Sequence, residues 1–274
     1  MRQRVYAHML HTRSWKYKAF LRYLRIFKYL AMAPVRGDFL ESYYVLMRYL
    51  DDVVDGDAPL PEGYASQADY LLTKISFSQD PTNPTDEVDY LMLHCFELAR
   101  KFGQDFTLET KDILESLLFD AKRRDKFKIF PHKELMHHFH VLDIRGTVRA
   151  TLKVFKEDSE KYPLLEPLGL ASRFQFDLED YRGDIAAGYV NISLEECDEF
   201  GITEEDIHDM ESPRLHLWFC HRARMGLELL ARHEENMSGA KFSLLARATF
   251  PVVYGNPARR IFEKTLRTYA KEQR

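Results

Sequence analysis

Residues 44–55 of the chain read YVLMRYLDDVVD, and the interpretation of the whole sequence starts from this stretch. The apolar residues around it follow a helical spacing, which predicts a helix over residues 39–54. On such a helix Asp51 and Asp55 are one turn apart and share a face, with Asp52 one position round. Arg48 lies one turn before Asp52 and borders the same surface. This stretch therefore predicts a helical face that carries three carboxylates and one guanidinium.

A second acidic stretch, DLEDYRGD at residues 177–184, repeats this spacing with Asp180 and Asp184. Like charges one turn apart destabilise an isolated helix by about 0.2–0.5 kcal/mol per pair, so something must compensate. For a single acidic cluster, solvent and neighbouring Lys or Arg side chains are the usual compensation. Because both clusters here have apolar neighbours, we predict that both face a partly buried space.

The donor chemistry of the two clusters favours magnesium. Carboxylate oxygens without nearby His or Cys suit Mg²⁺, which is commonly held by one or two carboxylates together with phosphate oxygens of the substrate. If the two clusters face each other, they could hold two or three Mg²⁺ ions around a diphosphate. Those ions would stabilise the charge that develops on a departing diphosphate.

Helical periodicity continues through most of the chain. Strand alternation is scarce, although the short apolar segment 189–192 could be extended. No repeat or Gly/Ser linker divides the sequence, so we expect one all-α domain over residues 1–274. Besides 39–54, helices are predicted over residues 86–102, 107–124, 133–156, 164–186, 203–210, 213–236, 240–249 and 256–272, with Asp86 as a candidate cap.

Composition excludes several classes of protein. With 274 residues, 45% of them apolar, the chain can bury a substantial core. A net charge of -4 argues against general nucleic-acid binding, which requires a basic surface. Three scattered cysteines favour neither a disulfide framework nor a thiolate zinc site. No apolar run is long enough for a membrane-spanning helix, so a soluble, cytoplasmic protein is expected.

The first 36 residues contain nine basic residues and no acidic one. Aromatic residues alternate with these cations, and the spacing over residues 15–30 predicts a basic amphipathic helix within an N-terminal segment, 1–30. Such a helix could pack as an ordinary first helix, line an entrance for an anionic substrate, or contact an anionic membrane surface peripherally.

The two acidic stretches and their flanks resemble the squalene/phytoene synthase family. Residues 44–55 are similar to its first aspartate-rich motif, YxxxRxxDDxxD. Asp180, Asp184 and Gly188, followed by LEECDEFGI at residues 194–202, are similar to its second motif and the continuation of that motif. The resemblance covers roughly residues 30–270 and keeps the order and spacing of the motifs.

The resemblance implies an all-α isoprenoid synthase fold with a central cavity between two aspartate-rich helices. It also implies an enzyme that binds allylic prenyl diphosphates through Mg²⁺ and ionises them, most simply to join two of them 1′–1 with release of diphosphate. Arg48 would then contact diphosphate, and Tyr44 would line the site. The implied magnesium ligands, which would also be the catalytic residues, are Asp51, Asp52, Asp55, Asp180 and Asp184.

Departures from the family pattern fall around the second motif. Glu179 stands where family members usually have Arg, and Phe176 where they have Asn. Gln175 and Asp177, on either side of Phe176, are therefore candidate substrate-binding residues, and Arg182 is the candidate for the missing positive charge.

Three functions remain open from the sequence. The first is the 1′–1 condensation of two prenyl diphosphates. The second keeps the ionisation but uses another acceptor, either an internal double bond, as in a terpene cyclase, or a non-isoprenoid aromatic molecule. The third is a catalytically silent relative that acts as a binding or assembly protein.

Overall fold

The computed structural model of the protein describes residues 5–7, 21–22, 24–25 and 34–269. Every regular element of these residues is a helix. Strand-like backbone pairing occurs among them only at one isolated parallel bridge, between Phe130 and Ser193. The predicted all-α fold is confirmed. Segment 189–192 is not helical, and it leads into that bridge. Most of the amphipathic helix predicted over 15–30 lies outside the described residues.

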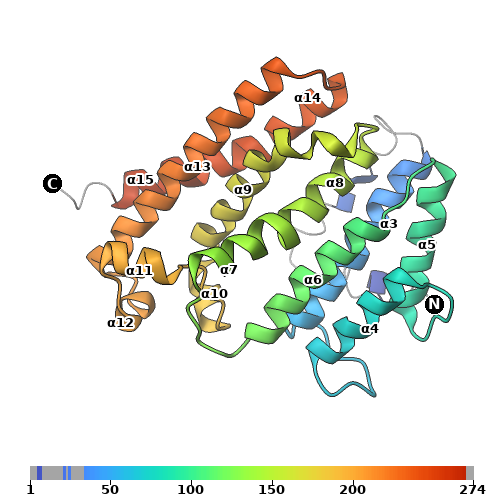
Figure 1. Ribbon diagram of the computed structural model, residues 1–274, viewed down its shortest axis with the longest axis horizontal. Helices are drawn as coiled ribbons and strands as arrows, with labels where there is room; N and C mark the ends of the chain where they lie inside the picture. The colour runs from blue at the N-terminus through green and yellow to red at the C-terminus, as the bar shows by residue number, and fades with distance from the viewer. Residues whose placement is uncertain (1–4, 8–20, 23, 26–33, 270–274) are drawn as a thin grey trace. The chain divides into compact units, whose positions relative to one another are not determined.

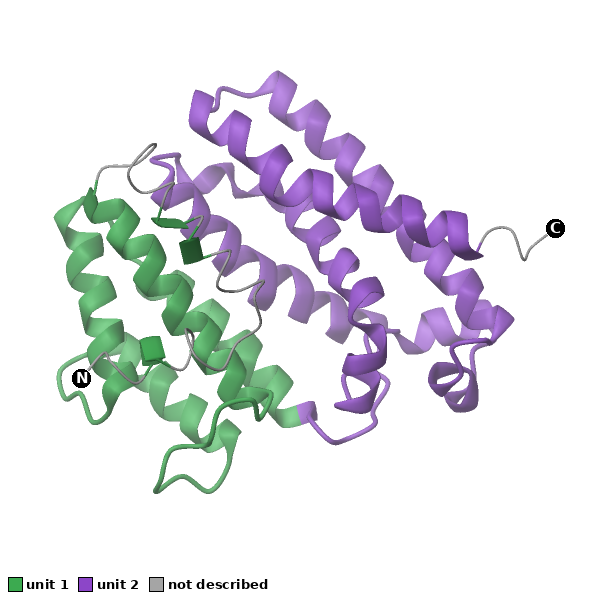
Figure 2. Ribbon diagram, turned by 180° about the vertical axis from the view of Figure 1, so that it is seen from behind, with its two compact units in different colours: residues 1–122 green, residues 123–274 purple. Residues whose placement is uncertain are grey.

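The chain divides into two compact units, residues 1–122 and 123–274 (Figure 2). That these units act as one domain stays a prediction. In the described part of the chain, no helix combines the length and the apolar character needed to cross a bilayer.

The first unit is built from α3 (Pro34–Val54), α4 (Gln67–Gln79), α5 (Glu87–Lys101) and α6 (Thr107–Arg123), whose last residue belongs to the second unit (Figure 1). Asp86 caps α5 as predicted, because its carboxylate accepts a hydrogen bond from the backbone N–H of Asp89 at 2.9 Å.

The core of the first unit holds α3 in place. Leu46 and Leu50 on its inner face are completely buried. The Phe39 ring packs against Phe106, with ring centroids 4.2 Å apart, and the buried hydroxyls of Tyr43 and Thr110 are hydrogen-bonded at 3.1 Å. These contacts position the C-terminal turns of α3, which carry the first acidic cluster.

The second unit is organised around a long central helix, α13 (Pro213–Gly239). This helix packs along α9 (Tyr162–Glu179) and α15 (Asn256–Tyr269) (Figure 1). Gly226 permits the close crossing of α13 and α15, because a Cβ there would lie 2.2 Å from the Phe262 ring. The other elements are α7 (His132–His137), the π-helix η1 (His138–Ile144), α8 (Arg145–Val154), the 3-10 turn η2 (Ser159–Lys161), α10 (Tyr181–Ala186), α11 (Leu194–Phe200), α12 (Glu204–His208), α14 (Leu244–Phe250) and the π-helix η3 (Pro251–Gly255).

Two predicted helices contain a change in backbone geometry that was not predicted, and two others begin elsewhere: α3 at Pro34 rather than at residue 39, and α14 at Leu244 rather than at residue 240. The helix expected over 133–156 contains the π-helical segment η1, which apolar spacing alone does not distinguish from an α-helix. The helix expected over 164–186 is interrupted at Asp180, where the backbone leaves helical geometry at φ -104 and ψ 7. Asp180 and Asp184 lie at the N-terminus of α10, where carboxylates interact favourably with the helix dipole, so the start of a new helix is favoured there.

Two α-helices, α4 and α11, were not predicted from the sequence, and neither were the short elements η2 and η3. The buried stripe of α4 has helical spacing, but it includes Lys74 and Ser78 beside its apolar residues. Lys74 is buried because its ammonium group pairs with the carboxylates of Asp86 and Asp89, at 2.7 and 2.6 Å. A search for apolar periodicity therefore misses this helix.

Candidate functional site

The first acidic cluster lies on the last turns of α3. The backbone N–H of Asp55 donates to the carbonyl of Asp51 at 2.8 Å, so the two residues are one helical turn apart as predicted. The side chain of Asp51 is 28% exposed, whereas that of Asp52 is completely buried and Asp55 is half-buried. Their degrees of exposure therefore differ within one turn of helix.

Arg48 supplies the compensation that this crowding of carboxylates requires. Its guanidinium lies 2.6 Å from an oxygen of Asp51 and 3.6 Å from one of Asp52. A positive charge shared by two carboxylates reduces their repulsion and holds both in a defined orientation. Tyr44, one turn earlier on α3, is partly exposed.

The second acidic cluster spans the junction between α9 and α10. Asp180 ends α9 and is exposed, and Asp184 lies half-buried on α10. The backbone N–H of Asp184 donates to the carbonyl of Asp180 at 3.0 Å, so the one-turn spacing survives the break in the helix. The side-chain amide of Asn191 donates to a carboxylate oxygen of Asp184 at 3.1 Å, which orients that carboxylate.

Burial raises the pKa of Asp184 to about 7. The positive charge of Arg173 opposes this shift, and the neighbouring carboxylates of Asp177 and Asp180 add to it. The protonated form of Asp184 is therefore favoured more strongly than that of an ordinary aspartate at the same pH. A cation bound beside it would favour the ionised form.

A buried network of charged side chains surrounds Asp177, which had been predicted to bind substrate. Asp177 lies inside the protein, 3.0 Å from the guanidinium of Arg173 and 4.0 Å from that of Arg222. Burial raises its pKa, although both arginines oppose the shift. These surroundings suit a structural role for Asp177 better than contact with substrate.

Arg222 on α13 connects this network to the segment that follows α10. Its guanidinium contacts Glu196 at 2.9 Å and the carbonyl of Asn191 at 3.1 Å, and it lies over the rings of Phe174 and Trp218. Arg222, Glu196 and Asn191 were not singled out from the sequence. Only the Arg173–Asp177 pair has a local signal, an i, i+4 spacing on α9.

The segment that carries Asn191 is held by the end of α6 and by the residues that follow it. Arg123 donates to the side-chain oxygen of Asn191 at 2.9 Å and lies over the Tyr189 ring. Gly188 has a φ of +84, and a Cβ at this position would lie 2.9 Å from the backbone nitrogen of Lys126. A glycine is therefore required here by both conformation and space.

The remaining predicted residues lie along α9 and α10. The amide of Gln175 donates to Glu179 at 3.1 Å, and Arg182 is exposed. Phe176, which stands where the family has Asn, is 50% exposed and lies one turn before Asp180. The second cluster is thus bordered by an exposed aromatic side chain.

The donors in each cluster fit magnesium. Each cluster contains two aspartates one helical turn apart, and their carboxylates offer oxygen ligands. Mg²⁺ is usually held by one or two carboxylates together with water and phosphate oxygens. Within the described residues, no group of three or more His, Cys, Asp or Glu side chains is arranged to hold a metal ion. The first cluster belongs to the first unit and the second to the second unit, so their convergence around a central cavity stays a prediction.

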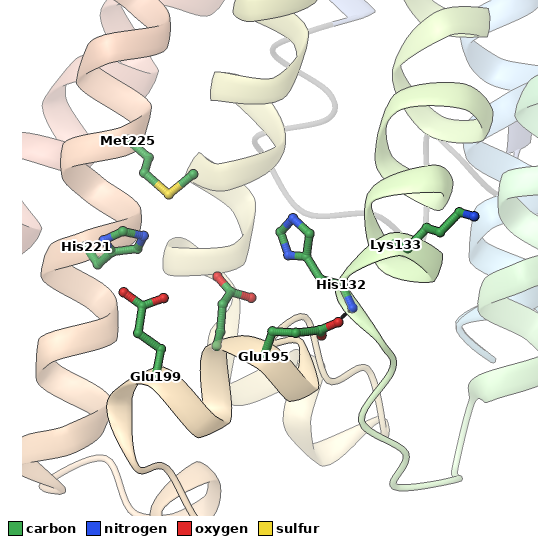
Figure 3. A pocket seen from close by; sticks show the side chains of 7 residues that line it. His132, Lys133, Glu195, Glu199, His221 and Met225 are labelled. Atoms are coloured by element: carbon green, nitrogen blue, oxygen red, sulfur yellow. Dashed lines mark hydrogen bonds between the residues drawn. The ribbon is translucent and has the colours of Figure 1, made fainter.

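A separate pocket of about 420 Å³ lies in the second unit, between the start of α7, α11 and α13 (Figure 3). Its lining contains none of the aspartates of the two clusters. Glu195, on its wall, accepts a hydrogen bond from the backbone N–H of His132 at 2.6 Å. The pocket is lined by His132, Lys133, Glu195, Glu196, Glu199, His221 and Met225.

No protein-family model and no curated protein matches the sequence of the chain. Among solved structures, the chain is similar to squalene synthase HpnC from Alicyclobacillus acidocaldarius, with a TM-score of 0.68 and 14% identity, over 92% of this chain and 94% of that one. It is also similar to a dehydrosqualene synthase solved in complex with a ligand, with a TM-score of 0.59 and 16% identity, over 93% of this chain and 84% of that one. The chain therefore has the all-α fold of squalene and dehydrosqualene synthases, and identities this low establish the fold alone.

Proposed function

We propose that the protein is a Mg²⁺-dependent prenyltransferase that ionises an allylic prenyl diphosphate, most simply to join two such molecules 1′–1 with release of diphosphate. One observation carries the proposal. The chain has a pair of carboxylates one turn apart at the end of α3, and another at the α9–α10 junction, in a fold shared with squalene and dehydrosqualene synthases.

In this proposal, some residues of each cluster bind Mg²⁺, and others hold the carboxylate ligands in position. Asp51, Asp55, Asp180 and Asp184 would hold Mg²⁺, whose charge stabilises a departing diphosphate when it is bound. Arg48 keeps the carboxylates of Asp51 and Asp52 in place on α3.

In the second unit, the carboxylate of Asp184 is held in position by a hydrogen bond from the side-chain amide of Asn191. Phe176, on the face of α9 that leads to Asp180, offers an apolar surface for an isoprenoid chain. Its ring could stabilise an allylic cation by a cation–π interaction.

The same residue favours a second candidate function. Phe176 and Glu179 place an apolar ring and a negative charge where the resembled family has an amide and a positive charge, and this alters the diphosphate-binding side of the second cluster. A site altered in this way suits a single diphosphate with a neutral acceptor. The acceptor would be a double bond of the same molecule, as in a terpene cyclase, or an aromatic molecule.

A product assay distinguishes these functions. The purified protein is incubated with Mg²⁺ and prenyl diphosphates of increasing chain length, with and without a chelator, and products are identified by mass spectrometry. A coupled product with twice the carbon number of the substrate, formed only with Mg²⁺, supports the condensation. A cyclic monomer supports the cyclase. No product, together with no calorimetric binding of any prenyl diphosphate in the presence of Mg²⁺, would contradict both and favour a silent relative.

The site itself is tested by Asp51→Asn and Asp180→Asn. Each substitution removes one charged ligand and keeps the size of the side chain, so turnover should fall by about a thousandfold while the helical circular dichroism spectrum is unchanged. Asp198→Asn, at an exposed position of α11, is the matched control and should keep full turnover. If both site variants remain as active as the control, the chemistry lies elsewhere.

A further inference from the structure

The segment between Glu235 and Glu263 contains no acidic residue and four cations, Lys241, Arg247, Arg259 and Arg260. It comprises the end of α13, then α14 and η3, and the first turns of α15. Figure 1 shows α14 at the end of the second unit where α13 ends. The whole chain has a net charge of -4, so this stretch, like residues 1–36, is a basic segment in a chain that is acidic overall.

The outer side of α14 and η3 is apolar. Leu244, Ala248 and Val252 are spaced i, i+4 and i+8 and are all exposed, Leu244 to 86% and Val252 to 62%. Tyr254, two residues after Val252 and near the end of η3, is also exposed, but it lies to one side of this stripe. We call the exposed residues Leu244, Arg247, Ala248, Val252 and Tyr254 the α14–η3 face.

The α14–η3 face is held rigidly from its inner side. Ser243 caps α14, because its hydroxyl accepts a hydrogen bond from the backbone N–H of Ala246 at 3.2 Å. The backbone N–H of Ser243 in turn donates to the carboxylate of Glu157 at 2.7 Å. Phe250, on the opposite side of α14, is buried and packs against Phe155 with ring centroids 5.2 Å apart. Leu244 is therefore exposed to water although the helix that carries it is capped and packed. A polar residue at this position would not weaken the fold.

Charge on and beside the α14–η3 face is positive. Lys241 and Arg247, three residues before and after Leu244, are exposed, and Arg247 forms no ion pair with any described residue. Arg260 on α15 is exposed, and Arg259 pairs with Glu234 at 2.7 Å.

The loop before α9 touches the start of α14 through Glu157 and Ser243, and its acidic residues are already engaged. In the loop before α9, Glu157 pairs with Lys161 at 2.6 Å and Glu160 pairs with Arg149. The carboxylate of Asp158 accepts the backbone N–H of Glu160 at 2.9 Å. The cations of the segment 236–262 are therefore not neutralised from this loop.

We propose that the α14–η3 face docks on the surface of an anionic lipid bilayer. Leucine and valine side chains enter the boundary of the acyl chains, a tyrosine suits the headgroup level, and the flanking cations are attracted to anionic headgroups. This chemistry is that of an interfacial amphipathic helix, with a fixed apolar stripe and a basic border. The inference does not depend on the proposed catalytic function, and it concerns residues other than those of the N-terminal segment 1–30.

The test uses the full-length chain and sedimentation of vesicles made of phosphatidylcholine alone or of phosphatidylcholine with phosphatidylglycerol. The protein should bind the anionic vesicles more tightly, and added salt should weaken that binding by screening the charges. The double variant Leu244→Ser, Val252→Ser should bind the anionic vesicles about tenfold more weakly or worse. Arg247→Glu should lose about tenfold on anionic vesicles and little on neutral ones.

Leu108→Ser is the matched control, because Leu108 is an exposed leucine on α6 in the first unit. This variant should bind both kinds of vesicle like the original chain. The proposal is overturned if the chain binds neither kind of vesicle. It is also overturned if the α14–η3 variants bind as tightly as Leu108→Ser, since another surface would then hold the membrane. If light scattering shows that the variants break an oligomer while vesicle binding is unchanged, the face binds a second copy of the chain and the proposal fails.

Discussion

Arg222 carries a full charge inside the second unit, and its surroundings show why it is tolerated there. It is 1% exposed, and its guanidinium lies between the carboxylates of Glu196 and Asp177 and over two aromatic rings. Burial raises the pKa of Glu196, but Arg222 and the hydrogen bonds from Ser193 and Trp218 outweigh this and leave the pKa below its usual value. Glu196 therefore stays ionised, and it depends on Arg222 for its charge balance.

Replacing this arginine should be costly. We expect Arg222→Met to lower the free energy of unfolding by about 3–5 kcal/mol, because it leaves the buried carboxylate of Glu196 without its charged partner. Urea unfolding followed by circular dichroism measures the change. Arg224→Met, at an exposed position two residues later on α13, should shift it by less than about 0.5 kcal/mol. Equal midpoints for the two variants would show that the network contributes little stability.

Gly188 allows two effects of a glycine substitution to be separated. Gly188 and Gly103 both have positive φ, +84 and +75, but only at Gly188 would a Cβ meet other atoms, the backbone nitrogens of Lys126 and Asp125. Gly103→Ala should cost about 1 kcal/mol through backbone strain alone. Gly188→Ala should cost clearly more, as measured by urea unfolding. Equal costs would mean that residues 125–126 move aside freely.

At the scale of elements, α12 is a five-residue helix that depends on its cap. Asp206 accepts hydrogen bonds from the hydroxyl of Ser212 and from the backbone N–H and hydroxyl of Thr203, at 2.6, 2.8 and 2.8 Å. These bonds to the ionised carboxylate hold the pKa of Asp206 well below its usual range. The ionised form of Asp206 therefore favours the folded state.

This lowered pKa predicts a pH dependence with a definite sign. Because the unfolded chain binds the proton more tightly, the stability that Asp206 contributes is present above about pH 4 and is lost as the pH falls further. The difference in unfolding free energy between the original chain and Asp206→Asn should therefore be largest near neutral pH and shrink towards pH of about 3. A difference that stays constant across urea titrations at these pH values would contradict the predicted role of ionisation.

At the scale of the whole molecule, the open question is whether the acidic cluster of each unit binds the same anion. A double-mutant cycle on Asp51→Asn and Asp180→Asn answers it, with calorimetric binding of inorganic diphosphate in the presence of Mg²⁺ as the measurement. If both clusters hold one diphosphate, either variant disrupts the whole site, so the two losses should be non-additive by about 1 kcal/mol or more. Losses that add would place the two clusters in separate sites.

The sequence alone predicts that two pairs of aspartates each lie one helical turn apart, Asp51 with Asp55 and Asp180 with Asp184. A spacing of four residues places two side chains one turn apart wherever the backbone is locally helical, and the hydrogen bonds from Asp55 to Asp51 and from Asp184 to Asp180 confirm both pairs. The cap at Asp86 was predicted for the same reason, since capping involves residues only three apart.

Local periodicity was thus sufficient for the all-α class, the C-terminal end of α3 and the two carboxylate pairs, because each depends on neighbours within a turn or two. Tertiary contacts decided the rest. Glu196 meets Arg222 across 26 positions, and Asn191 meets Arg123 across 68. Such pairs determine which carboxylates are buried as structural charges, as at Glu196, and which stay near the surface, as at Asp180. No local pattern encodes that choice, because burying a charge is favourable only where a distant partner is brought to it by the fold.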